Sequence, residues 1–76
     1  MVMGCVLIKL MSGMDKKAFS TIKKLESKGT YALFGEYDAL MMVEAEDIKK
    51  LTSFVVDNIR SIEGVESTRT MICAEI

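Results

Sequence analysis

Apolar side chains gather in four segments of strand length along the chain. Residues 3–11 combine β-branched and apolar side chains and predict a first strand. Residues 30–36 and 38–45 predict two more strands, joined by a tight turn at 35–38. Residues 65–75 predict a fourth strand. Along the chain, the pattern therefore indicates one strand before and one strand after a hairpin.

Two other segments repeat apolar side chains every three or four positions, as one face of an amphipathic helix does. The first helix is predicted over 15–28, with Ser12 loosely fitting a capping pattern before it and Gly29 stopping it. The second helix is predicted over 47–62, with Gly64 as its stop. The predicted buried stripes are Ala18, Ile22 and Leu25 in the first helix, and Ile48, Leu51, Val55, Ile59 and Ile62 in the second.

The resulting order of elements is β-α-β-β-α-β, which is the split, ferredoxin-like arrangement of the α+β class. Right-handed crossovers place both helices on one face of a four-stranded antiparallel sheet. The chain is thus expected to form a single domain over residues 1–76.

The other face of this sheet is predicted to be more apolar than a solvated face should be. Alternation along the strands assigns Cys5, Leu7, Leu40 and Met42 to one shared face. An antiparallel sheet that faces water on one side is normally polar there. We therefore predict that this face packs against a partner sheet, most simply in a two-fold dimer.

Composition limits the class of protein. Half of the 76 residues are apolar and the net charge is −1, which indicates a globular domain and argues against a basic nucleic-acid module. The lysines of the first helix are read as a solvated face, with a phosphate-contacting face as the alternative. No apolar run reaches the ~18 residues of a membrane span, and the N-terminus does not resemble a signal peptide, so a cytoplasmic location is expected.

The sulfur-containing residues suggest packing rather than metal chemistry. Cys5 and Cys73 lack metal-ligand spacing and there is no histidine, so no metal site is expected. The two cysteines are expected to be buried free thiols, with a disulfide between neighbouring strands as the alternative. Met41, Met42 and Met71 are read as core or interface packing, or as the lining of an apolar pocket.

The chain has few side chains that could catalyse a reaction. The chain has no histidine to act as a general base, no nucleophile elbow and no phosphate-binding glycine loop. We therefore expect neither an enzyme nor a cofactor.

The candidate binding residues lie in the predicted turn and in the last strand. Gly35 permits unusual backbone angles, and Asp38 can accept hydrogen bonds from backbone N–H groups or from a ligand amine. Alternatively, Asp38 only ties down the turn and Tyr37 only covers the end of the core. Thr68 and Thr70 are two residues apart, so their hydroxyls share one face and could donate to a ligand carboxylate, although threonine also simply suits strands.

Two motifs at this spacing resemble the effector-binding domain of the Lrp/AsnC transcription regulators, the RAM domain. Gly35-Glu36-Tyr37-Asp38 is similar to the family's Gly-x-Tyr-Asp turn. Residues 62–70, with Gly64-Val65 before Thr68 and Thr70, are similar to its Gly-Val-x-x-Thr-x-Thr segment. The resemblance extends over essentially the whole chain in the same order of elements.

The resemblance implies a domain that dimerises through its sheet, often assembles further into octameric rings, and binds amino acids or related metabolites between dimers. Carried over, Gly35, Tyr37 and Asp38 would frame the site, with Asp38 facing the ligand ammonium group. Thr68 and Thr70 would contribute from the last strand.

The chain departs from the full regulators because it begins directly at the first strand, without a helix-turn-helix domain. It therefore resembles a stand-alone RAM protein that would modulate full-length regulators by co-assembly without contacting DNA itself. The alternatives are a small dimeric α/β-barrel enzyme that acts on a small organic substrate, and a structural partner subunit without a ligand. The segment between Leu25 and Gly35 is short for this family, so the side-chain specificity of the pocket could differ.

Overall fold

The computed structural model describes residues 1–74 and confirms the predicted order of elements. The strands are β1 (Val2–Leu10), β2 (Gly29–Ala32), β3 (Ala39–Ala45) and β4 (Val65–Ile72). The helices are α1 (Asp15–Lys23) and α2 (Ile48–Phe54), and α2 continues as a π-helical segment, η1 (Val55–Ile59). Residue 75, which was included in the predicted last strand, lies outside the described residues.

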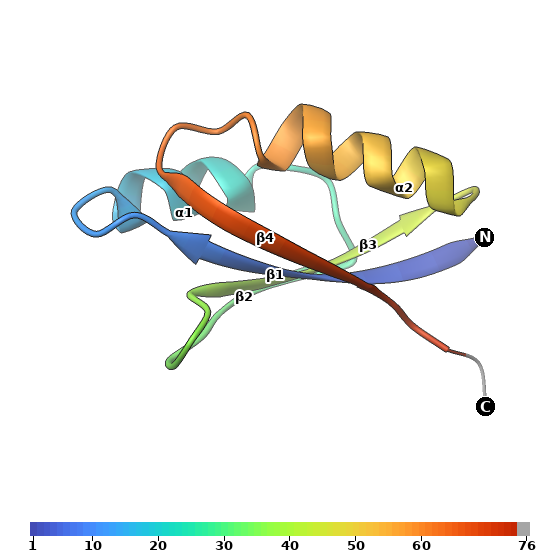
Figure 1. Ribbon diagram of the computed structural model, residues 1–76, viewed down its shortest axis with the longest axis horizontal. Helices are drawn as coiled ribbons and strands as arrows, with labels where there is room; N and C mark the ends of the chain where they lie inside the picture. The colour runs from blue at the N-terminus through green and yellow to red at the C-terminus, as the bar shows by residue number, and fades with distance from the viewer. Residues whose placement is uncertain (75–76) are drawn as a thin grey trace.

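The four strands form one antiparallel sheet in the order β2-β3-β1-β4. Both helices lie on the same side of this sheet, as Figure 1 shows. The β1–β4 register shifts by one residue between Lys9 and Leu10, which marks a β-bulge. The predicted ferredoxin-like α+β architecture is thus confirmed.

The core fills the space between the helices and the sheet. The buried strand residues alternate along β1 and β3. The helices contribute most of the stripes expected from the sequence, but the burial predicted for Ile48 was wrong, since this first residue of α2 is 57% exposed. Gly4 makes room for this packing, because a Cβ atom there would lie 2.5 Å from Leu51 Cδ2. The buried apolar residues are Val6, Ile8, Leu10, Ala18, Ile22, Ala39, Met41, Val43, Leu51, Val55 and Ile59.

The first helix is shorter than predicted, and its ends differ from the expected ones. Its N-cap is Met14, without a side-chain cap, so the capping role expected for Ser12 was wrong. The helix ends at Lys23 rather than 28. The reason is that the Lys28 N–H already donates to the Met42 carbonyl at 2.8 Å, which aligns the chain with β3 before Gly29 begins β2.

The second helix widens after its second turn. Asp47 caps it by accepting a 2.8 Å hydrogen bond from the Lys50 N–H. The buried residues Leu51, Val55 and Ile59 are spaced by four, which exceeds the 3.6 residues of an α-helical turn. The wider turn, closed by Arg60 N–H donating to the Val55 carbonyl at 2.9 Å, keeps these side chains facing the sheet. No helix within residues 1–74 is long and apolar enough to cross a membrane.

The side of the sheet away from the helices carries the apolar residues assigned to it. Cys5, Leu7, Leu40 and Met42 alternate with the buried residues and remain partly exposed. Both cysteines are free thiols, as expected. Cys73 is exposed rather than buried, because it lies just beyond the end of β4, an edge strand.

Candidate ligand-binding site

The predicted turn between β2 and β3 is a six-residue connection whose two ends are closely held. The Leu33 N–H donates to the Asp38 carbonyl at 2.9 Å, which closes the connection. Gly35 has a φ of 128°, a conformation that glycine adopts without strain. The Asp38 N–H donates to the Ile8 carbonyl at 2.9 Å, so the end of the connection is attached to β1.

The Asp38 carboxylate has a defined partner in the protein. Its Oδ2 accepts a 2.7 Å hydrogen bond from the Leu10 N–H, at the end of β1. Its Oδ1 accepts no hydrogen bond from the described part of the chain, and it is not a buried, unsatisfied atom. One oxygen therefore positions the side chain, and the other is free to face a ligand.

A hollow of about 370 Å³ opens beside this carboxylate. The β2–β3 connection forms one wall, and the segment from the end of β1 to the start of α1 forms the other. Three carboxylates and one ammonium group line it, so its charge is negative and suits a cationic group. The lining residues are Lys9, Leu10, Met11, Ser12, Gly13, Asp15, Gly35, Glu36 and Asp38.

Only two of the five residues proposed from the sequence, Gly35 and Asp38, line this hollow. Tyr37 is half-buried and lies outside its lining. Thr68 and Thr70 pair with Ile8 and Val6, on the side of β1 opposite to β3. Two strand spacings, roughly 10 Å, therefore separate Thr68 from the turn within one chain.

The wall formed by residues 11–15 was not identified from the sequence. Ser12 and Gly13 directly follow a predicted strand, which is a turn signal and could have suggested a loop beside the hairpin. The hydrogen bond from the Leu10 N–H to Asp38 has no comparable signal, because it depends on the pairing of β1 with β3.

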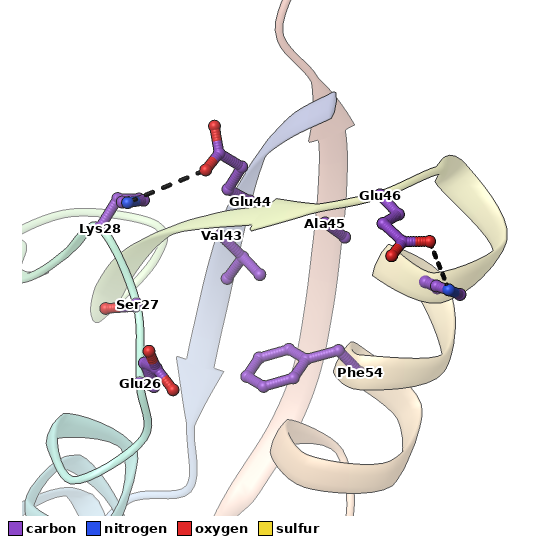
Figure 2. A pocket seen from close by; sticks show the side chains of 9 residues that line it. Glu26, Ser27, Lys28, Val43, Glu44, Ala45, Glu46 and Phe54 are labelled. Atoms are coloured by element: carbon purple, nitrogen blue, oxygen red, sulfur yellow. Dashed lines mark hydrogen bonds and ion pairs between the residues drawn. The ribbon is translucent and has the colours of Figure 1, made fainter. Parts of the chain in front are cut away.

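A second hollow, of about 480 Å³, lies at the other end of β3, between α2 and the segment after α1. Figure 2 shows Val43 and Phe54 pointing into it, with Glu26 on the opposite wall. Two ion pairs border it, Lys28–Glu44 at 3.8 Å and Lys50–Glu46. The charged groups at its rim therefore largely neutralise one another.

Comparison with known proteins identifies the class to which this fold and turn belong. Residues 18–76 match the family described as the Lrp/AsnC ligand binding domain, and the chain belongs to that family. It is 32% identical over 76 residues to the HTH-type transcriptional regulator FL11 of Pyrococcus furiosus. The match covers 99% of this chain and 50% of FL11, so the chain spans about half the length of that regulator.

Solved structures agree with this assignment. TTHA0845 from Thermus thermophilus superposes with a TM-score of 0.88 at 28% identity, covering 100% of this chain and 96% of that one. AsnC of E. coli superposes with a TM-score of 0.87 at 25% identity, covering 99% of this chain and 52% of AsnC. The resemblance inferred from the two motifs is thereby confirmed, and FL11 is a transcriptional regulator.

Proposed function

We propose that this chain is an effector-binding and oligomerisation module that takes an amino acid, or a related small metabolite, beside the Gly35–Asp38 turn. The observation that carries the proposal is the free Oδ1 of Asp38 at the edge of a negatively charged hollow. A carboxylate already held by the Leu10 N–H loses little conformational freedom when it meets a ligand ammonium group. Glu36 on the same wall adds to the attraction.

The remaining ligand contacts come from a second subunit. A ligand carboxylate needs donors, and Thr68 and Thr70 offer hydroxyl groups, but not in this hollow within one chain. A neighbouring copy that brings its β4 toward the turn would complete the site. Binding would then favour the oligomer in which the two halves meet.

The face of the sheet opposite to the helices is the proposed dimer interface. Leu7 and Leu40 are directly paired on it, and Cys5 is paired with Met42 one row along. Tyr31, which pairs with Leu40, is 56% exposed on the same face. Covering these side chains with the matching face of a second copy removes apolar surface from water.

The same face would allow this chain to assemble with full-length Lrp/AsnC regulators in the cytoplasm. Relatives of twice its length share its fold over the matched half, so their sheets offer a similar surface. The chain would change regulator activity by entering the assembly, and by adding or removing a ligand site. If dimers associate through their Gly35–Asp38 turns, ring-shaped oligomers of several dimers form.

The first test is a thermal-shift screen of the purified protein against the common amino acids at millimolar concentration. A ligand at about 100 times its dissociation constant stabilises the folded state by about 2.7 kcal/mol, which raises the midpoint measurably. A shift with one or a few amino acids supports the sensor function and identifies the ligand class. If no amino acid raises the midpoint, the chain is a structural partner subunit, in which Asp38 serves only the turn.

A further inference from the structure

The second hollow, of about 480 Å³ at the far end of β3, lies on the helix side of the sheet. Val43, which lines it, alternates with Met42 along β3 and therefore faces the helices. The proposed dimer interface is on the opposite side of the sheet, so a second copy bound there leaves this hollow open. Its volume falls within the range of about 300–1,000 Å³ that is usual for small-molecule sites.

The interior of the second hollow is apolar. Phe54, the last residue of α2, packs against the core but is only partly buried. Its ring points into the hollow, as Figure 2 shows. Val43 and Ala45 supply the adjoining apolar wall from β3. The alkyl group of a ligand placed here would cover these side chains and remove their apolar surface from water.

One carboxylate at the rim of the second hollow has no ion-pair partner among residues 1–74. Three carboxylates and two ammonium groups line the hollow, so one negative charge remains after pairing. Lys28 pairs with Glu44, and Lys50 pairs with Glu46. The remaining carboxylate is that of Glu26, which lies on the wall opposite to α2. The charge of the hollow therefore suits a cation held near Glu26.

We propose that the second hollow binds a small aliphatic amine, with its ammonium group between the Phe54 ring and the Glu26 carboxylate and its alkyl group against β3. The ring attracts a cation to its face, and the carboxylate accepts a charged hydrogen bond. A zwitterionic amino acid is disfavoured, because both lysines that line the hollow are paired and none is left for its carboxylate. The site thus differs in place and in chemistry from the one beside the Gly35–Asp38 turn.

The test is a titration of the isotope-labelled protein with isopentylamine, followed by two-dimensional NMR. Saturable shifts with a millimolar dissociation constant should appear at the amides of Val43, Ala45 and Phe54. Isopentanol has the same carbon skeleton without the charge, and it should bind roughly fivefold more weakly, the effect of one partly exposed ion pair. Leucine has the same skeleton with a carboxylate added, and it should shift these amides less than isopentylamine does.

Two variants remove the proposed contacts one at a time. Glu26→Gln should weaken isopentylamine binding roughly fivefold, and Phe54→Leu about two- to fivefold, through loss of the ion pair and of the ring face. Glu63→Gln is the matched control, since it removes an exposed carboxylate that lines neither hollow, and it should bind as the unaltered chain does.

The proposal is overturned if isopentylamine shifts only the amides around Asp38, or if isopentanol binds as tightly as the amine. It is also overturned if Glu26→Gln binds isopentylamine as tightly as Glu63→Gln does. These shifts are read at β3 and α2, whereas the amino-acid site is tested by substitution of Asp38, so the two proposals can fail separately.

Discussion

The Oδ2 atom of Asp38 accepts a 2.7 Å hydrogen bond from the backbone N–H of Leu10, 28 residues earlier in the chain. This bond gives one side chain two functions, because the same carboxylate ties the hairpin to β1 and borders the acidic hollow. The two functions respond differently to substitution.

Asp38→Ala should lower the free energy of unfolding by about 1–2 kcal/mol, because the Leu10 N–H loses a charged acceptor at a partly exposed site. Asp38→Asn keeps an acceptor oxygen, so its free energy of unfolding should be close to that of the unaltered chain. It removes the charge that attracts an ammonium group. Urea unfolding and calorimetric titration with the ligand from the thermal-shift screen separate the effects. Unchanged ligand affinity in Asp38→Asn would show that the carboxylate does not face the ligand.

Gly4→Ala should destabilise the fold by about 1–3 kcal/mol, the usual cost of overpacking a core. The added methyl group would lie 2.5 Å from Cδ2 of the fully buried Leu51. In Leu51→Ala the crowding is absent, so adding Gly4→Ala to that variant should cost much less. A double-mutant cycle from urea unfolding measures this coupling, and purely additive effects would contradict the proposed contact.

Leu40→Lys should dissociate the proposed dimer. A lysine at the centre of an apolar interface must lose its hydration or leave, which costs about 1–3 kcal/mol and raises the dissociation constant roughly 10–100-fold. Val56→Lys, at a 45% exposed position on the helix side, serves as the control and should leave assembly unchanged. Sedimentation equilibrium gives both values. Equal dimer dissociation constants in the two variants would show that the interface lies elsewhere.

The Cys5 thiol should react slowly with iodoacetamide at pH 8. Burial, and then the negative charge of Cys73, raise the pKa of Cys5 above its ordinary value of 9.0. The exposed Cys73 should be alkylated first, and peptide mass spectrometry reads the two rates. Cys73→Ser should speed the reaction of Cys5 at fixed pH, and a slower reaction in that variant would contradict the electrostatic contribution.

The same raised pKa fixes the sign of a stability change in alkali. Since the folded state holds the Cys5 proton more tightly than the unfolded chain, the contribution of Cys5 is complete below pH 9.0. It declines as the pH rises through the pKa of the folded state. Chemical unfolding in Cys5→Ser should therefore show a shallower loss of stability above pH 9.0 than the unaltered chain does.

The order of elements and the two sheet faces could be predicted because both follow from periodicity. Alternation placed Val6 and Ile8 opposite to Leu7, and the structure has the same division. The end of α1 could not be predicted in this way. It depends on the Lys28–Met42 hydrogen bond, which links segments that are distant in the sequence.

The site was predictable only where a local turn defines it. Gly35 and Asp38 share a hollow because both belong to one connection. Thr68 and Thr70 were placed correctly on one strand, but their distance from the turn depends on the strand order, with β1 between β3 and β4. The opposing wall, at residues 11–15, required the three-dimensional path of the chain.

The shift in register between β1 and β4 determines which side chains of β4 point to the buried face of the sheet. Lys9 pairs with Ser67 but Leu10 pairs with Val65, so Glu66 is the one unmatched residue. Without this shift in register, Leu10 would pair with Glu66, and the Glu66 carboxylate would point toward the helices. The additional residue turns Val65 toward the core and leaves Glu66 exposed. A deletion of this single residue would therefore join the two parts of β4 into an unbroken ladder, with Val65 still opposite Leu10 and Ser67 still opposite Lys9, so both would keep their faces.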